Sequence, residues 1–420
     1  MRFYTQNKGW TLAAVLLVIL GGCSSTGTAP ASEAVDSPNP AESSDVANAS
    51  TILAPSTDWV ATSSPLSAAR SIHAQAISPD GRWLAEIRDR EACVQSLESA
   101  EEPICTFDET IGGDSLRWNS ESTAFTTGGT LSGSFRNTGI WTIEIDGTAT
   151  ELLATTPGIG IRPEVPLEVV YGAAYRPDAG SIVYADFSED SDEPDEGVQL
   201  RVFEIDLAGE RTEIARYSDP GNLAFPLVPL SDGRVVISYG NFDAATIDIL
   251  DQGRRSTLIV GETDPASGII IEIPTVVEAQ PINEEVLLAT SPDLDDTNRP
   301  EPEWYLLDFE GERFPLITEG EEVVFGATFS PDGNYVAYLT IERDEFIGEF
   351  HVAAVETLLA GGRDRVGSIS IDADYLRRPS NVGFLADPQI MRWTSNTQVR
   401  MAFFDFIGER DQQVVTIDLS

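Results

Sequence analysis

Short apolar stretches alternate with tight turns along the chain from about residue 59 to its end. The pattern is clearest in residues 76–85 and 328–337, where an apolar stretch leads into Ser-Pro-Asp-Gly and an alternating apolar and polar stretch follows. Proline presets φ at the second position of a turn, aspartate caps the turn, and glycine accepts a positive φ. Each of the two segments therefore predicts a hairpin of two β-strands.

Five weaker copies of this hairpin pattern occur elsewhere in the chain. The seven turns centre near residues 80, 119, 178, 232, 283, 332 and 396. A second hairpin follows most copies, as in residues 140–153, 200–214 and 304–317, where an alternating strand ends in aspartate before a glycine turn. Four strands per unit, at a spacing of about 40 to 64 residues, are typical of the blades of a β-propeller.

The repeat resembles the Pro-Asp propeller repeat of TolB-like proteins, which is related to the WD repeat and also forms the N-terminal propeller of prolyl-oligopeptidase-type peptidases. The resemblance covers about residues 59–420 and implies an all-β fold, a single β-propeller of four-stranded blades. We expect seven blades. Six blades, the number in TolB itself, is the alternative. The long interval before the last unit could contain an insertion around residues 370–375.

The two ends of this region are expected to meet. The last unit stops after its third strand, in residues 414–420, and therefore lacks a fourth. A segment before the first hairpin, around residues 58–62, is predicted to supply that strand and to close the ring.

Residues 1–22 are predicted to be a lipoprotein signal peptide. Arg2 and Lys8 precede an apolar run of 11 residues, 10–20, which is too short to span a bilayer. The following Leu-Gly-Gly-Cys resembles the bacterial lipobox, and the resemblance implies that Cys23 carries the lipid anchor. A plain secretory signal is the alternative.

The predicted location is extracytoplasmic and membrane-anchored, at the outer membrane or periplasm of a two-membrane bacterium and otherwise at the cell surface. Residues 23–58 are predicted to be a flexible linker, since they are rich in Ser, Thr, Ala and Pro and contain no aromatic residue. In this oxidising compartment Cys93 and Cys105, which flank the polar run 97–102, are predicted to form a disulfide across a hairpin. Two unpaired buried thiols are the alternative.

The charge of the chain restricts its partners. It contains 69 Asp and Glu against 26 Lys and Arg, a net charge of -43. Removal of the signal peptide would leave −45 and no lysine. Such a surface repels nucleic acid, so no nucleic-acid partner is expected. We expect a monomer that favours cationic or cation-bridged partners.

Few residues offer catalytic chemistry. The chain has two histidines, His73 and His351, both expected to be packing residues, and it has no Gly-x-Ser-x-Gly motif and no zinc-ligand spacing. The arginine pairs at 254–255 and 377–378 could hold an anion, but local charge balance is favoured. Two acidic loops offer weak calcium candidates, although solvated loops are the favoured interpretation. The calcium candidates are Asp190, Asp192, Asp195, Asp293, Asp295 and Asp296.

The favoured hypothesis is a non-enzymatic binding scaffold, lipid-anchored through Cys23, for a protein, peptide or glycan of the cell envelope. Its ligand would bind at the loop-bearing face or in the central channel. One alternative is a glycan-cleaving hydrolase, which would need two carboxylates about 5–10 Å apart at the channel mouth. The other is a structural surface protein stabilised by Ca²⁺. No cofactor other than Ca²⁺ is expected.

Overall fold

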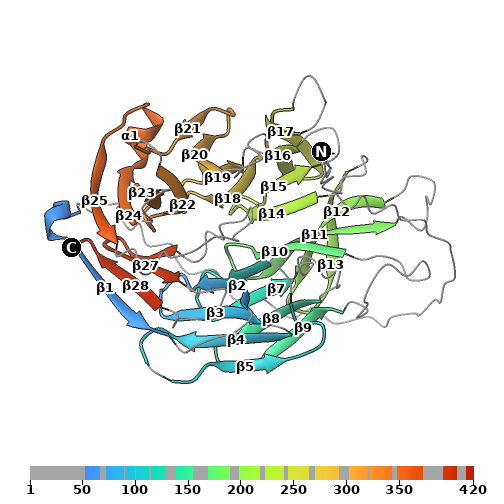
Figure 1. Cartoon of the computed structure of the whole chain (residues 1–420). Helices are drawn as coiled ribbons and strands as arrows, with labels where there is room; N and C mark the ends of the chain where they lie inside the picture. The colour runs from blue at the N-terminus through green and yellow to red at the C-terminus, as the bar shows by residue number, and fades with distance from the viewer. Residues whose placement is uncertain are drawn as a thin grey trace, which may run out of the picture.

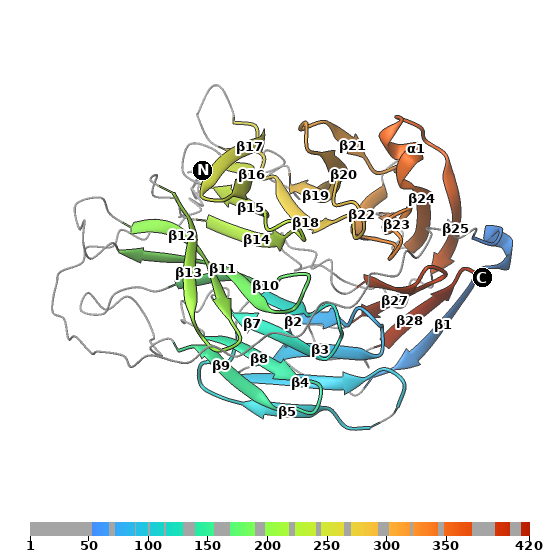
Figure 2. The same ribbon diagram turned by 180° about the vertical axis from the view of Figure 1, so that it is seen from behind.

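Seven four-stranded antiparallel sheets surround one axis (Figure 1), and the opposite view shows the same arrangement (Figure 2). This confirms the all-β propeller and its seven blades. The structure is a computed structural model. It describes residues 53–420 except 67–71, 89, 100, 113–114, 129–138, 155–168, 190–197, 218–222, 241–244, 264–269, 293–301, 320–321, 343–347, 372–390 and 404–412. The predicted signal peptide and Cys23 lie outside the described residues.

Each blade places its first strand next to the axis and its fourth strand outermost. The first strands are β2 (Ile72–Ile77), β6 (Ser115–Trp118), β10 (Val169–Tyr175), β14 (Leu223–Pro229), β18 (Thr275–Ala279), β22 (Glu322–Phe329) and β26 (Met391–Ser395). The second strands are β3 (Trp83–Arg88), β7 (Ala124–Gly128), β11 (Ser181–Glu189), β15 (Val235–Gly240), β19 (Val286–Pro292), β23 (Tyr335–Glu342) and β27 (Gln398–Phe403). We number the blades 1 to 7 in this order.

The outer half of each blade is the second predicted hairpin. The third strands are β4 (Glu91–Ser96), β8 (Ile140–Glu144), β12 (Val198–Asp206), β16 (Ala245–Asp251), β20 (Pro302–Asp308), β24 (Gly348–Ala354) and β28 (Gln413–Asp418). The fourth strands are β5 (Ile104–Phe107), β9 (Ala149–Leu153), β13 (Arg211–Tyr217), β17 (Arg254–Val260), β21 (Arg313–Pro315), β25 (Arg365–Ile371) and β1 (Val60–Pro65).

The Ser-Pro-Asp-Gly turn folds as a local hydrogen-bonded unit. In blade 1 the Ser78 hydroxyl donates to Asp80 Oδ1 at 2.6 Å and accepts the Trp83 N–H at 3.0 Å, and Asp80 Oδ1 also accepts the Arg82 N–H. Equivalent bonds recur in blade 6 between residues 330 and 335. Local side-chain bonds of this kind favour a turn over a continued strand. They explain why both segments with a complete Ser-Pro-Asp-Gly sequence fold as hairpins.

The ring closes through strands from the two ends of the chain. β1 pairs antiparallel with β28 over its whole length, from Val60 opposite Asp418 to Pro65 opposite Gln413. Figure 1 shows the blue β1 beside the red β28. The predicted closure by a segment before the first hairpin is thereby confirmed, with the strand placed slightly later than residues 58–62.

The folded part begins before the predicted end of the linker at Asp58. Leu53 is buried, the Ala54 N–H donates to the Leu419 carbonyl at 3.1 Å, and the Trp59 indole N–H donates to the Ala54 carbonyl at 2.9 Å. These apolar side chains pack into the core cluster shared by blades 6 and 7. Residues 53–58 therefore belong to the folded part, because burial of Leu53 and Trp59 offsets the entropy cost of ordering the segment.

The long interval before the last unit contains ordinary parts of blade 6. A short helix, α1 (Val355–Leu359), joins its third strand to β25, and β25 includes Ser370 and Ile371. The start of the suspected insertion is therefore a strand of the blade. Besides α1, the described residues contain one 3-10 turn at Ser56–Asp58, and no helix in this part of the chain is long and apolar enough to cross a bilayer.

Neighbouring blades pack through apolar faces and two equivalent tryptophans. The indole N–H of Trp118 in blade 2 donates to the Ala76 carbonyl of blade 1 at 2.9 Å. The indole of Trp393 in blade 7 donates to the Thr328 carbonyl of blade 6 at 3.2 Å. Each tryptophan directly precedes the first turn of its own blade, so the repeat fixes both the packing and the hydrogen bond.

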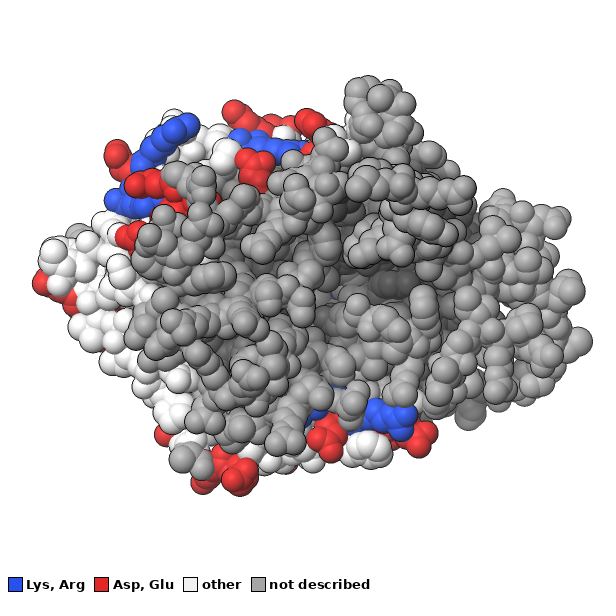
Figure 3. Space-filling model, in the orientation of Figure 1, with Lys and Arg blue, Asp and Glu red and all other residues white. Residues whose placement is uncertain are grey.

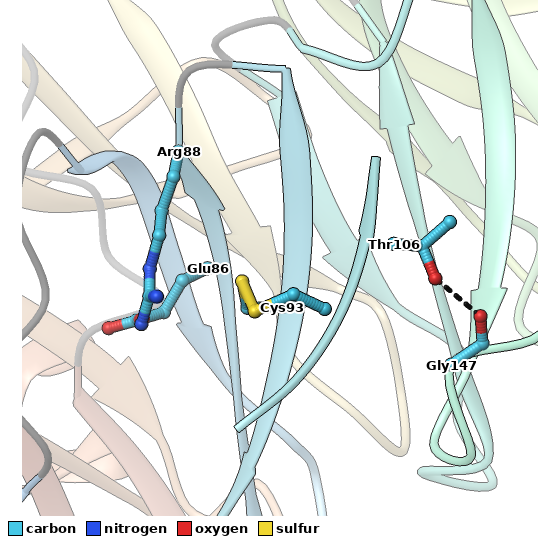
Figure 4. The surroundings of a disulfide bond; sticks show 6 residues. Glu86, Arg88, Cys93, Thr106 and Gly147 are labelled. Atoms are coloured by element: carbon cyan, nitrogen blue, oxygen red, sulfur yellow. Dashed lines mark hydrogen bonds and ion pairs between the residues drawn. A yellow bond between two sulfur atoms is a disulfide. The ribbon is translucent and has the colours of Figure 1, made fainter. Parts of the chain in front are cut away.

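The predicted cysteine pair lies between the outer strands of blade 1. Cys93 of β4 is directly opposite Cys105 of β5, and the two are joined by a disulfide. Beside it the Thr106 hydroxyl donates to the Gly147 carbonyl of blade 2 at 2.6 Å (Figure 4). The disulfide therefore holds a strand that also contacts the next blade.

We expect the double substitution Cys93→Ser with Cys105→Ser to lower the free energy of unfolding by about 3 kcal/mol, because a crosslink over a short loop restricts the unfolded chain. Denaturant titration followed by circular dichroism measures this loss. Alkylation of the folded parent without reductant is the matching control, and labelling of both thiols would contradict the disulfide.

We expect Trp59→Ala to lower the free energy of unfolding by about 3–5 kcal/mol, since it removes a large side chain from the closure of the ring. Val60→Ala, at a side chain that is 54% exposed, should change stability by less than about 0.5 kcal/mol. Both variants are measured by the same denaturant titration. Equal losses would show that burial of the Trp59 side chain contributes little to the stability of the closed ring.

Candidate functional site

Seven structurally equivalent residues lie next to the axis, two positions before the start of each first turn. The start is marked in six blades by a backbone N–H that closes the turn, as at Ser78, Asn119 and Ser330, and in blade 7 by Thr394 between the paired strands β26 and β27. We call these seven residues the axial ring. Its members are Ala76, Arg117, Ala174, Val228, Glu278, Thr328 and Arg392.

Glu278 is the centre of the polar contacts in the axial ring. Its carboxylate accepts the Phe329 N–H at 3.0 Å and the Thr328 hydroxyl at 3.2 Å. Arg392 Nη1 lies 3.6 Å from Glu278 Oε2, and Arg117 also attracts the carboxylate electrostatically. All of the partners except the Phe329 amide belong to the axial ring itself.

The ion pair of Arg392 with Glu278 extends across the propeller axis, and Arg117 belongs to a third blade. Glu278 belongs to blade 5, Arg392 to blade 7 and Arg117 to blade 2. No two of these blades are neighbours in the ring, so their side chains can interact only by reaching toward the middle. Solvent reaches this place, since 35% of the Arg392 side chain and 16% of the Glu278 side chain are exposed.

Burial sets the protonation behaviour of Glu278. Removal from water raises the pKa of this carboxyl above its ordinary value. Arg392, the Phe329 N–H, the Thr328 hydroxyl and Arg117 stabilise the charged form and offset only part of that rise. Burial therefore destabilises the charged form of Glu278, and nearby positive charge reduces that destabilisation.

The charge of the axial ring is opposite to that of the whole chain. Arg117 and Arg392 bring two guanidinium groups, and Glu278 brings the one carboxylate among the seven residues. Guanidinium groups bind carboxylates through paired hydrogen bonds and are suited to anion recognition. The ring can therefore bind an anionic group.

The sequence contains a signal for this site in the charged residues that precede the turns. Arg117 and Arg392 occur in the two copies with an aromatic residue before the turn, Leu-Arg-Trp and Met-Arg-Trp. Glu278 occupies the same repeat position in a copy whose turn is degenerate. Alignment of all seven copies on their turns would have placed these three charges at one level.

Two arginine pairs were predicted as possible anion sites. One lies in blade 4, and the other lies outside the described residues. Arg255 in β17 pairs with the buried Asp248 at 2.9 Å and lies over the Tyr217 ring at 4.5 Å, as the charge-balance interpretation expects. Residues 377–378 lie outside the described residues. So do the six calcium candidates, Asp190, Asp192, Asp195, Asp293, Asp295 and Asp296.

The two histidines occupy strands. His73 belongs to β2, and His351 is fully buried in β24. Burial, with a contribution from Arg365, lowers the pKa of His351 to about 3, so the imidazole is neutral at ordinary pH. His351 does not belong to the axial ring.

A groove of about 670 Å³ lies between blades 3 and 4, at the end where their first turns meet. Its cation, Arg176, pairs with Glu204 at 2.9 Å and donates to the Gly233 carbonyl at 3.0 Å. These bonds join the two blades, so the groove's one strongly basic side chain is already committed to structure. The groove is a weaker candidate than the axial ring for this reason.

Basic side chains at the surface also have acidic neighbours. In the face shown in Figure 3, coloured acidic and basic side chains lie beside one another at several places along the rim. Arg82, for example, pairs with Glu98 at 3.0 Å although both are exposed. Such exposed pairs contribute little to stability, and they do not by themselves indicate a binding site.

We expect Glu278→Gln to remove a pH dependence from stability. The folded-state pKa of Glu278 is raised, so the native state holds the proton more tightly than the unfolded state does, and stability falls as pH rises from the unfolded value of about 4.3 through the folded value. The free energy of unfolding of the parent relative to the variant should therefore decrease between pH 4 and 7. A difference that stays constant or increases would show that the arginines outweigh burial.

Comparison with known proteins supports the fold. No family model and no curated protein sequence matches the chain, so the resemblance to TolB-like repeats stays a prediction. An oligogalacturonate lyase in complex with manganese is similar in structure, with 14% sequence identity, a TM-score of 0.50 and coverage of 86% of this chain and 91% of that chain. An oligogalacturonate lyase from Vibrio parahaemolyticus has 13% identity and a TM-score of 0.49, with coverage of 87% and 92%. At this identity the first likeness shows the architecture alone, and the chain is a seven-bladed β-propeller.

Proposed function

We propose that the protein is a binding scaffold of the cell envelope, anchored by lipid at Cys23, that binds an anionic group of a peptide, protein or glycan at the axial ring. The observation that carries the proposal is the ion pair of Arg392 with Glu278 between two non-neighbouring blades, with Arg117 at the same repeat position of a third blade. The predicted signal peptide and lipobox support the location. The structural contacts support the ligand chemistry.

Binding of an anion at the axial ring depends on contacts there and not on long-range electrostatic attraction. The mature chain would carry −45, which repels anions, but salt at physiological concentration screens charges beyond a Debye length of about 8 Å. At the axial ring an anionic group would be within hydrogen-bond reach of guanidinium groups, where local geometry outweighs net charge. The ligand would therefore bind through one inserted anionic group rather than through a broad acidic surface.

A carboxylate is the anion that this site fits best. A bound carboxylate can take the place of Glu278 as the partner of Arg392, with the same charge and the same planar geometry. A free peptide C-terminus and an acidic sugar both carry this group. Galacturonate is one such sugar, and oligogalacturonate, named for the structurally similar lyase, is a convenient glycan probe.

We expect the full-length protein to bind trigalacturonate or an acetylated tripeptide with a free C-terminus, and its affinity to fall about tenfold or more in Arg117→Gln and Arg392→Gln. Glu278→Gln should bind the same probe more tightly than the parent does, because it removes the competing carboxylate. Isothermal titration calorimetry measures each constant.

Two matched controls make the result specific. Arg82→Gln removes an arginine that is 57% exposed and does not belong to the axial ring, and it should bind as the parent does. The tripeptide with an amidated C-terminus should not bind. Absence of binding to both probes, or equal affinities in the Arg392 and Arg82 variants, would overturn the proposal.

A further inference from the structure

Two carboxylates and one imidazole lie close together in blade 6. Glu322 begins β22, and Glu349 and His351 occupy alternate positions of β24, so they lie on one face of the sheet. One potential ligand atom from each residue lies within 4.8 Å of the other two. The same face carries Tyr338, which packs in the core cluster shared by blades 5 and 6. The three residues therefore belong to the boundary between these blades and are distinct from the axial ring.

The imidazole offers an unused electron pair. His351 is fully buried, and its Nε2 lies 2.8 Å from the Thr340 hydroxyl oxygen. The Thr340 hydroxyl can donate to the Glu349 carbonyl at 3.3 Å, which leaves its oxygen to accept the Nε2 proton. The neutral ring then carries no proton on Nδ1, and Nδ1 has no hydrogen-bond partner in the described part of the chain.

An unpartnered buried nitrogen is costly unless something binds it. Buried polar groups in proteins are almost always satisfied, and an unsatisfied one loses its hydration without compensation. Metal-ligating histidines commonly use one ring nitrogen for the ion and donate the other N–H to a neighbouring oxygen. His351 with Thr340 has this arrangement.

The charges around the three residues do not cancel. Arg365 Nη1 pairs with Glu319 at 3.2 Å, and Arg365 Nη2 lies 3.4 Å from Glu322. Three carboxylates, from Glu319, Glu322 and Glu349, therefore face one guanidinium, and the imidazole is neutral. The group carries a net charge of −2, which a divalent cation would neutralise while Arg365 keeps Glu319 as its partner.

We infer that Glu322, Glu349 and His351 form a binding site for a divalent transition-metal ion. One nitrogen and two carboxylates suit Zn²⁺ or Mn²⁺, whereas Ca²⁺ needs six to eight oxygen ligands. Ligand atoms about 2.1 Å from an ion are about 3–3.5 Å apart, so the side chains must approach one another by about an ångström on binding. The ion would join β22 to β24 at the boundary with blade 5.

We expect the full-length protein, stripped with chelator and then supplied with Zn²⁺, to retain one more equivalent than Glu349→Gln and Glu322→Gln do after gel filtration. The affinity for this equivalent should fall about tenfold or more in both variants. Glu319→Gln is the matched control, because it removes the same charge from a residue that is 76% exposed and supplies no ligand. It should retain the equivalent. Mn²⁺ is the second ion to test, with Ca²⁺ and Mg²⁺ as ions that should not replace Zn²⁺.

A second readout identifies the nitrogen ligand without a substitution in the core. The chain has only two histidines, so a spectrum of ¹⁵N-labelled histidine should show two imidazoles. Zn²⁺ should shift the nitrogen signals of His351 and leave those of His73 unchanged, with assignment from His73→Gln. Retention of no Zn²⁺ by the parent, equal retention by the Glu349 and Glu319 variants, or unchanged His351 signals would each overturn the inference.

Discussion

Pairing of β1 with β28 is the constraint on which the rest of the molecule depends. The sheet of each blade packs only against the sheets of its neighbours, so a chain of seven blades encloses an axis only if the first and last are joined. The main-chain ladder from Val60 to Pro65 makes that joint, and burial of Leu53 and Trp59 extends it. Closure removes two exposed sheet edges at once. It also fixes the distance of every first strand from the axis, which brings axial-ring residues from non-neighbouring blades into contact.

The first turns carry this constraint around the ring. Bonds run from the turn of one blade to the next, as from the Asp80 N–H to Ser122 Oγ at 2.9 Å and from the Gln280 side chain to the Gly333 carbonyl at 2.7 Å. Arg400 of blade 7 donates to the Gly81 carbonyl of blade 1, and this bond links the last blade to the first. Equivalent positions of the repeat therefore lie at the same level along the propeller axis in every blade. The residues two positions before each first turn form one such level, the axial ring.

The sequence predicted what depends on local chemistry and missed what depends on closure. Turn residues, alternation and spacing were sufficient for the seven four-stranded blades, and the spacing of Cys93 and Cys105 was sufficient for their pairing. Arg117 and Glu278 are more than 150 residues apart in the chain, and only their shared position in the repeat relates them. His351 is fully buried, as the packing interpretation expects, and its acidic neighbour Glu322 comes from another strand of the same blade.

The acidity of the chain acts differently at its two candidate sites. At the axial ring two arginines outnumber one carboxylate, so the local charge is opposite to the net charge and can select an anion at contact distance. At the boundary of blades 5 and 6 three carboxylates outnumber Arg365, so the local charge has the same sign as the surface and can concentrate a cation. Net charge therefore does not determine the ligand of either site. The side chains that the fold brings together at each site determine it.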